Sequence, residues 1–270
     1  MLDAVTTLAL LAAASWYGRG LVRGRGAVRV GQAAAWFGGL AVWAVALLGP
    51  IDRAAVGSFA VHMVQHLLLT LVGAPLLVLG GPLVVLARAG GARTRRTLSR
   101  LARSRGLGAL VHPLVATAAF TVVPWAIHLT PVFDRALGSE LWHALEHAAW
   151  IGSALLFWWP VLGTDPVPRP WSHPARLLAL FLAMPAMSFL ALAIHAAEAP
   201  LYPTAVRLEG AEAALASQRA GAVVMWIGGN LLLVGWMLVV AARWRTEEER
   251  RQRRLEARED RARERLEPAG

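Results

Sequence analysis

Seven long apolar segments constrain what this chain can fold into more than any other feature. A helix that crosses the hydrocarbon core of a bilayer needs about 20 mostly apolar residues. Of the 270 residues, 57% are hydrophobic and only 16% are charged, whereas a soluble domain carries about 25% charged residues. We therefore expect an all-α integral membrane protein, a bundle of about seven transmembrane helices. The segments lie at about 2–18, 31–49, 58–86, 108–128, 139–162, 175–198 and 217–242.

The third segment is too long for one straight span. Gly73 and Pro75 interrupt it, and Gly80, Gly81 and Pro82 follow near its predicted inner end. Proline removes a backbone donor and clashes with the preceding helical turn, so it kinks or ends a helix. We expect a kink in this span and then a broken end.

Arginine sets the predicted orientation. All 27 basic residues are arginines, and 23 of them lie in, or next to, the connections on one side of the seven segments. The other side holds only Arg53, Arg135, Arg207 and Arg219. Because cytoplasmic loops are enriched in basic residues, we expect the N-terminus outside and the C-terminus in the cytoplasm. The expected location is the cell membrane, as a multi-pass protein of a bacterial inner membrane.

The net charge of +10 and the absence of cysteine exclude several classes of protein. Nucleic-acid binding needs a basic surface interleaved with stacking aromatic residues, and the sequence has no such pattern. Seven arginines between Arg88 and Arg105 are instead expected to face anionic membrane lipid. A chain without cysteine has neither a disulfide framework nor a thiolate metal site. We expect membrane lipid, and no nucleic acid, among its partners.

Composition divides the chain into a transmembrane domain at 1–242 and a charged cytoplasmic tail at 243–270. The tail has glutamate–arginine pairs four residues apart, which lie side by side on a helix, so we expect a solvated helix. The pairs are Glu247 with Arg251, Glu249 with Arg253, and Glu259 with Arg263. Tryptophans near predicted span ends are interpreted as aromatic belts at the membrane surfaces. They are Trp125 and Trp142 at outer ends, and Trp158, Trp159 and Trp244 at inner ends.

Six of the eight histidines gather at the predicted outer ends of four spans. Two pairs with a spacing of four residues stand at the starts of the third and fifth spans, and single histidines stand near the ends of the fourth and sixth. They are His62 and His66, His143 and His147, His128, and His195. The other two, His112 and His173, each precede a proline at a predicted helix start. Proline favours that position, so we interpret these two as helix-start residues.

The six outer histidines predict a metal site. Ionisable residues inside a membrane are costly and usually face the bundle interior with a partner. Histidines four apart share one helix face, and two facing pairs of neutral imidazoles can complete the coordination of one ion. Glu146, Glu198 and Met63 are expected around the site, with Glu146 orienting an imidazole. Interhelical hydrogen bonding and a proton relay are the alternatives.

Copper is the expected metal. Imidazole suits copper, zinc and iron, and copper heads the divalent affinity series. Haem is the competing cofactor, because His66 and His147 lie on different helices and could be its axial ligands. A single haem leaves the paired spacing unexplained. A membrane di-iron oxygenase also uses such pairs, but on the cytoplasmic side, opposite to the side predicted here.

Four segments resemble the multi-span cytochrome c oxidase assembly factor CtaG, the family linked to caa(3)-type oxidases. They are FAVHMVQHLLLTLVGAPLLVLGGP (59–82), LWHALEHAAWIGSALLFWWPVLGTDP (141–166), IHAAEAPLYP (194–203) and QRAGAVVMWIGG (218–229). The resemblance covers about residues 30–242. It implies a seven-helix membrane protein that matures the oxidase by serving its copper centre, with oxidase subunits as partners. One departure is the run Ala216-Ser217-Gln218, which lacks the acidic residue expected before the glutamine and so weakens the case for a carboxylate from this helix at the site.

The predicted function is that of an assembly factor or chaperone of the respiratory chain rather than an enzyme. It would bind or relay copper through the outer-leaflet histidine cluster while it contacts cytochrome c oxidase subunits. The alternative is a haem-binding membrane electron-transfer protein or oxidoreductase. A copper transporter is a third possibility, but no series of polar ligands continues from the cluster toward the cytoplasmic end.

Overall fold

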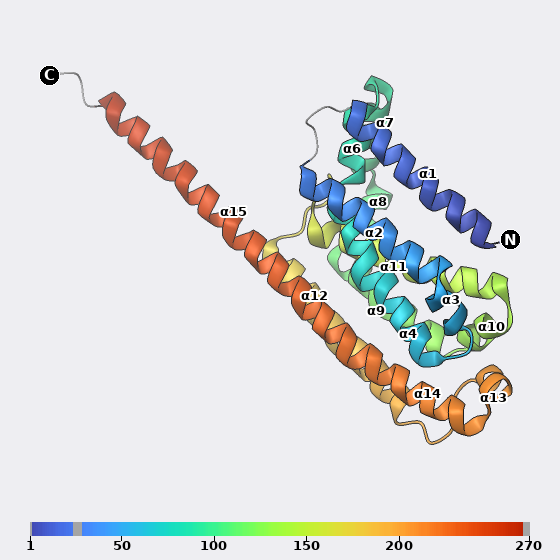
Figure 1. Ribbon diagram of the computed structural model, residues 1–270. Coiled ribbons are helices and arrows are strands. Elements are labelled where there is room, and N and C mark those ends of the chain that lie inside the picture. The colour runs from blue at the N-terminus through green and yellow to red at the C-terminus, as the bar shows by residue number, and fades with distance from the viewer. Residues whose placement is uncertain (1, 24–28, 267–270) are drawn as a thin grey trace.

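The computed structural model describes residues 2–23 and 29–266, with the side chains of 3–23 and 29–259. Every regular element in those ranges is helical, which confirms the all-α class. Figure 1 shows a bundle along one side of which α12 and the long α15 run together. The elements are α1 (Leu2–Arg23), α2 (Val30–Leu48), α3 (Pro50–Ala55), α4 (Phe59–Leu67), the π-helix η1 (Leu68–Gly73), α5 (Ala74–Leu79), α6 (Pro82–Ala89), α7 (Ala92–Ala102), α8 (Arg105–Leu110), α9 (Pro113–His128), α10 (Val132–Gly138), α11 (Glu140–Leu162), α12 (His173–His195), α13 (Pro203–Glu209), α14 (Ala211–Val223), the π-helix η2 (Val224–Gly228) and α15 (Gly229–Leu266).

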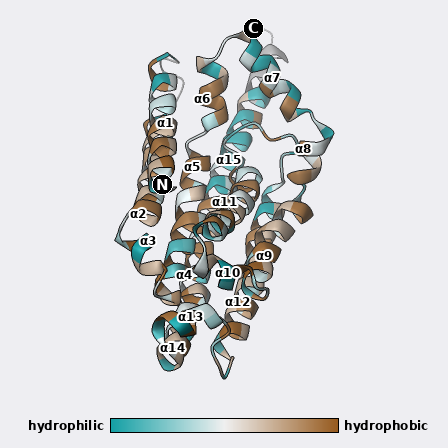
Figure 2. Ribbon diagram, turned by 90° about the vertical axis from the view of Figure 1, so that its right-hand side faces the viewer, coloured by the Kyte–Doolittle hydropathy of each residue, from teal (hydrophilic) through white to brown (hydrophobic). Residues whose placement is uncertain are grey.

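Four helical segments of the described chain are long and apolar enough to cross a membrane. They are Val30–Leu48, Phe59–Ala89, His173–His195 and Ala211–Glu259. A fifth results if α9 and α10, which meet at 65°, count as one broken span. The expected spans at 2–18 and 139–162 form helices of sufficient length, α1 and α11, but these are not among the candidates. Figure 2 shows hydrophilic residues on α7 at one end of the bundle and on α13 and α14 at the other, with mostly hydrophobic helices such as α9 and α12 between them.

The third span is broken where the glycines and prolines predicted it. Helix α5 ends before Gly80, and Gly81 takes a left-handed conformation with φ of 64°, which favours glycine. Helix α6 then begins with Pro82. Asp165, from the connection between α11 and α12, accepts the backbone N–H groups of Leu83 (3.1 Å) and Val84 (2.9 Å). This carboxylate caps α6 and ties the broken end to the neighbouring connection.

Replacing Asp165 with alanine should lower the free energy of unfolding by about 1 kcal/mol, because two N–H groups at the start of α6 lose their acceptor. Burial raises the pKa of the Asp165 carboxyl from 3.8 to about 6. The folded state therefore binds this proton more tightly than the unfolded state, so the contribution to stability is greatest below pH 3.8 and is lost as the pH rises to 6.

Asp165→Asn separates the titration from part of the capping, because its amide does not titrate and its single oxygen can still accept one of the two N–H groups, which bond to different carboxylate oxygens. Thermal unfolding of the purified protein between pH 4 and pH 7 is the measurement. We expect the alanine variant to unfold at a lower temperature, and the asparagine variant to depend less on pH than the unsubstituted protein. An unchanged pH dependence in the asparagine variant would show that Asp165 does not titrate in this range.

Three tryptophans fix the third span at its π-helical turn, η1. A π-helical turn shifts the backbone hydrogen bonds by one residue and leaves carbonyl groups free for other donors. Three indole N–H groups, from α2, α11 and α15, donate to three successive carbonyl oxygens of η1. The bonds run from Trp43 to Leu69 (3.0 Å), from Trp158 to Thr70 (2.7 Å) and from Trp236 to Leu71 (2.7 Å). Trp158 is fully buried, so its predicted place in an aromatic belt is wrong.

The charged tail continues α15 as a helix, as predicted, with every described side chain from 248 to 259 except Glu248 exposed. Its ion pairs differ from the predicted ones. Glu249 lies 3.7 Å from Arg245, and Arg251 lies 3.8 Å from Glu248, while Glu247 contacts His173 instead. The third predicted pair ends at Arg263, outside the side chains that the structure describes. Long side chains on a solvated helix choose among partners three and four residues away on either side.

Candidate metal centre

Two short helical segments bring the paired histidines together. The Ser58 hydroxyl accepts the N–H of Val61 and so caps α4, on which His62 and His66 lie one turn apart with ring centroids 4.4 Å from each other. His143 and His147 stand one turn apart near the start of α11, with centroids 4.2 Å apart. The two pairs face each other across the bundle. The centroids of His62 and His143 are 5.4 Å apart, and those of His66 and His147 are 5.6 Å apart.

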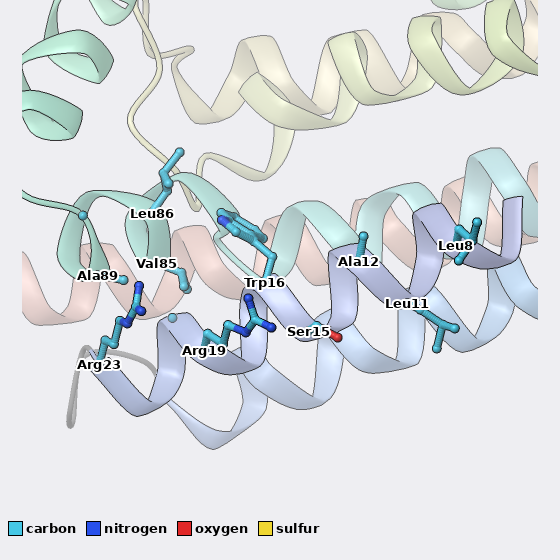
Figure 3. A pocket seen from close by; sticks show the side chains of 12 residues that line it. Leu8, Leu11, Ala12, Ser15, Trp16, Arg19, Arg23, Val85, Leu86 and Ala89 are labelled. Carbon is cyan, nitrogen blue, oxygen red and sulfur yellow. The ribbon is translucent and has the colours of Figure 1, made fainter. Parts of the chain in front are cut away.

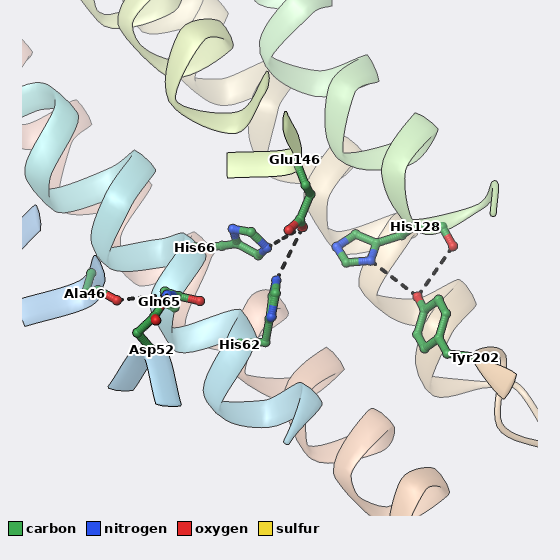
Figure 4. A network of polar contacts seen from close by, with 8 residues as sticks. All are labelled: Ala46, Asp52, His62, Gln65, His66, His128, Glu146 and Tyr202. Atoms are coloured by element: carbon green, nitrogen blue, oxygen red, sulfur yellow. Dashed lines mark hydrogen bonds and ion pairs between the residues drawn. The ribbon is translucent and has the colours of Figure 1, made fainter. Parts of the chain in front are cut away.

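Glu146 lies between the imidazoles of α4. Its Oε1 is 3.3 Å from Nε2 of His62 and 2.9 Å from Nε2 of His66, as Figure 4 shows. With His147 these residues form a group whose potential ligand atoms all lie within 4.8 Å of one another. When each ligand atom lies about 2 Å from a bound ion, two ligand atoms on opposite sides of it are about 4 Å apart. The separations in this group are close to that distance. The group could therefore hold one metal ion.

Burial and unpartnered nitrogen atoms support this possibility. His62, His66 and Glu146 are at most 2% exposed, and His147 is 8% exposed. Nδ1 of His62, Nδ1 of His66, Nε2 of His147 and Oε2 of Glu146 have no hydrogen-bond partner among the described residues. Most buried polar atoms in proteins have a hydrogen-bond partner or bind a metal or water. Several buried polar atoms without a partner in one place therefore indicate a binding site for a further group. Nitrogen atoms of neutral imidazoles are suitable metal ligands.

Aromatic side chains enclose the cluster. Trp150 stacks on the ring of His66 at a centroid distance of 4.4 Å, and Phe133 meets His62 edge-on at 5.0 Å. Met63 is 1% exposed and packs in the same apolar cluster as Trp150 and Phe133. Met63 follows His62 in the chain and has an apolar packing role. Neither residue was predicted. Phe133 comes from α10 through tertiary packing, whereas Trp150 lies on α11 four residues after Glu146, a spacing that could have placed it on the same face.

His128 joins the edge of the cluster. It ends α9, is 2% exposed, and its ring centroid is 6.5 Å from that of His66. The Tyr202 hydroxyl lies 3.3 Å from Nδ1 of His128, while Nε2 has no partner among the described residues. Figure 4 shows this tyrosine on the far side of His128 from Glu146. Tyr202 holds His128 and was missed as a site residue, although it belongs to one of the segments that carry the family resemblance.

The structure does not bring His195 and Glu198 to the cluster. His195 is exposed, and its Nδ1 lies 3.4 Å from the carbonyl oxygen of Arg219. Its neighbour Ile194 is fully buried instead. Successive residues on a helix differ by about 100° in direction, so when Ile194 faces the bundle, His195 faces away from it. Glu198 follows the helix and is exposed. Helix α12 ends at His195, three residues before the predicted end at 198, and the face that meets the bundle was not predicted.

The two histidines before prolines stand at helix starts, as predicted. His112 precedes the first residue of α9 and its Nδ1 accepts the N–H of Leu114. His173 is the first residue of α12, where it stacks on Trp244 and lies 3.0 Å from a carboxylate oxygen of Glu247. Neither belongs to the histidine cluster.

Helix α14 contacts the elements that carry the site through Ser217 and Gln218. The Ser217 hydroxyl is 3.2 Å from that of Ser58, the cap of α4. Gln218 is 1% exposed, accepts the N–H of Leu201 (2.8 Å) and donates to the carbonyl of Ile194 (3.1 Å). These two residues hold the start of α4 and the end of α12 in place.

A separate hollow of about 550 Å³ lies between α1 and α6. Figure 3 shows Arg19 and Arg23 on α1 beside the apolar side chains of Val85 and Leu86. No histidine lines it, so it is not part of the metal centre.

Comparison with known proteins identifies the family. A family model for the cytochrome c oxidase caa3 assembly factor (Caa3_CtaG) matches residues 15–247. The chain belongs to this family. Its match covers the whole histidine cluster and every candidate membrane span except the last part of α15. The predicted resemblance to this assembly factor family is therefore confirmed. No solved structure shows a significant match to the chain.

Three mycobacterial proteins are also similar to this member of the assembly factor family. Uncharacterized protein Mb0105 of Mycobacterium bovis and Uncharacterized protein MT0111 of Mycobacterium tuberculosis are each 29% identical over 242 residues. Uncharacterized protein ML1998 of Mycobacterium leprae is 29% identical over 243 residues. The matches cover 86% of this chain but only 36% of each relative, so the relatives are much longer proteins.

Proposed function

We propose that this protein binds copper at the histidine cluster and passes it to cytochrome c oxidase during assembly. The observation that carries the proposal is the buried group of His62, His66, Glu146 and His147, whose ligand atoms lie within 4.8 Å. Imidazole nitrogens with no thiolate available favour copper among the metals that such a site accepts. Membership of an oxidase assembly family supports a role in maturation rather than catalysis.

The protein groups have distinct tasks in this proposal. His62, His66, His143 and His147 supply nitrogen ligands, and His128 stands at the edge as an outer ligand or partner. Glu146 contacts Nε2 of both α4 imidazoles through Oε1 and thereby fixes which nitrogen of each ring faces the ion. Trp150 and Phe133 restrict rotation of the rings and exclude water. Copper is cargo here, so the site must also release it to an oxidase subunit.

The geometry favours a single ion over haem. The axial histidines of one haem iron approach from opposite faces of the macrocycle. Here the four paired rings lie side by side with centroids 4.2 to 5.9 Å apart, which leaves no space for a macrocycle between them. An absorption spectrum of the purified protein is the direct test. We expect no Soret band, and an intense one would favour the haem-binding oxidoreductase instead.

We further propose a seven-span topology in the cell membrane of a bacterium, with the N-terminus and the histidine cluster outside. The support is the arginine distribution of 23 against four. The spans would occupy residues 1–242, with 243–270 as a cytoplasmic tail and α7 lying on anionic lipid. Oxidase subunits would meet the protein within the membrane.

A topology reporter tests this arrangement. A reporter enzyme that is active only outside the cytoplasm should be silent when fused after residue 245 and active when fused after residue 210. The reason is that the two positions lie on opposite sides of the last predicted span. Activity measured in intact cells, normalised to the amount of fusion protein, is the readout. Strong activity at 245 would reverse the orientation and place the histidine cluster near the cytoplasm.

A further inference from the structure

An acidic cavity of about 460 Å³ adjoins the histidine cluster. It lies where α1, α3 and α11 begin, and three carboxylates line it, from Asp3, Asp52 and Glu140. None of its described lining residues is basic. Asp3 and Glu140 are exposed, and Asp52 is half-buried. In a protein with a net charge of +10, this cavity is a local region of negative charge.

The inner wall of the cavity is formed by two of the cluster histidines, His143 and His147. His147 is 8% exposed, and its Nε2 has no hydrogen-bond partner among the described residues. Its ring centroid lies 5.6 Å from that of His66 and 4.2 Å from that of His143. His143 is half-buried. The cavity therefore leads from exposed carboxylates, past a half-buried imidazole, to a buried imidazole of the metal centre.

Asp52 is held at the cavity by a buried neighbour of the cluster. Gln65 is fully buried on α4, next to His66 in the chain, and its Nε2 donates to Oδ1 of Asp52 (2.8 Å) and to the carbonyl of Ala46 (2.8 Å). One amide thus fixes a carboxylate on α3 and the end of α2 relative to the histidines. A carboxylate held in this way keeps its position before a cation arrives.

We propose that this cavity is the entrance through which a copper ion reaches the histidine cluster. The inference rests on the proposed function. Asp3, Asp52 and Glu140 attract the cation and concentrate it at the mouth, because a concave surface with charge of one sign focuses its field. Oxygen ligands suit copper less well than imidazole nitrogen, so the ion moves on to His143 and then to His147. The carboxylates govern the rate of loading, and the histidines govern how much copper is held.

Rapid mixing of the purified full-length protein with Cu²⁺ tests the entrance, with quenching of tryptophan fluorescence as the signal. The variant is Asp3→Asn with Glu140→Gln. At low ionic strength we expect its bimolecular association rate to fall about 10-fold, the lower end of the range for electrostatic steering. Copper per chain at saturation should stay unchanged. In 1 M salt, where the Debye length is about 3 Å, the two rates should converge.

The matched control is Glu209→Gln with Glu212→Gln. It changes the net charge by the same amount, neither residue lines the cavity, and Glu212, like Glu140, lies in the first turn of a helix. Its loading rate should equal that of the unsubstituted protein. Three outcomes would each contradict the proposed entrance. Both double variants could load copper equally slowly, or Asp3→Asn with Glu140→Gln could load it as fast as the unsubstituted protein. The third outcome is that Asp3→Asn with Glu140→Gln holds less copper at saturation. If the unsubstituted protein takes up no copper at all, the proposed function itself fails.

Discussion

Cells whose only copy of this protein carries His66→Ala are expected to assemble cytochrome c oxidase that lacks its copper and most of its activity. His66 lies at the middle of the cluster, 2.9 Å from Glu146 and stacked on Trp150. Its loss removes a nitrogen ligand and leaves a buried carboxylate with one partner fewer. Loss of an outer partner of a metal typically costs 10- to 100-fold in affinity, and loss of a ligand should cost at least about 100-fold. Oxidase activity and copper in isolated membranes measure the effect.

A second variant and two controls keep this result interpretable. His147→Ala should act like His66→Ala, although it lies on a different helix, so a shared effect does not come from local damage to α4. His112→Ala and His173→Ala change histidines at helix starts and should leave oxidase copper intact. Immunodetection of each variant in the membrane separates a lost site from lost protein. Full oxidase activity in both the His66→Ala and the His147→Ala cells would mean that the cluster serves only interhelical hydrogen bonding and packing.

Glu146→Gln should weaken copper binding by about 10- to 100-fold while leaving the histidines in place. Nε2 of His62 and Nε2 of His66 both contact Oε1, whereas Oε2 has no partner among the described residues. An amide in this place is neutral and puts a donor group where Oε2 stands. The loss of the negative charge weakens the acceptor that sets the proton positions of both imidazoles, and such an orienting partner is worth that much in other metal sites. Competition with a chromophoric Cu(I) chelator gives the affinity.

The exposed Glu212 on α14 supplies the control, since Glu212→Gln removes the same charge away from the cluster. Its copper affinity should match that of the unsubstituted protein. An unchanged affinity in Glu146→Gln would mean that the carboxylate neither orients the imidazoles nor binds the ion.

Local spacing predicted the centre of the site because helical geometry converts spacing directly into direction. Residues four apart must share a face, so both histidine pairs and Glu146 could be placed from the sequence. The same geometry failed for His195, because a shift of one residue changes the direction by about 100° and nothing local fixes which residue faces inward. Tyr202 reaches the cluster from a distant position, which only tertiary packing determines.

The broken third span also has one feature that local sequence predicts and one that only tertiary packing determines. Two glycines followed by a proline predicted the break at α6, since their backbone preferences are local. The π-helical turn η1 carries no comparable signal, and its free carbonyl groups are satisfied by tryptophans from three other helices. Of these three tryptophans, only Trp158 was expected in a membrane belt, from its position near a predicted span end. The structure shows that the three tryptophans hydrogen-bond to η1, which directly follows the helix that carries His62 and His66.

The amount of copper bound per chain tests the central claim most directly. Protein purified from membranes would be loaded with Cu(I), passed through a desalting column and analysed for metal beside two double variants. We predict about one copper per chain for the unsubstituted protein and for His112→Ala with His173→Ala, and almost none for His66→Ala with His147→Ala. Equal copper in all three proteins would contradict a metal centre built from the paired histidines.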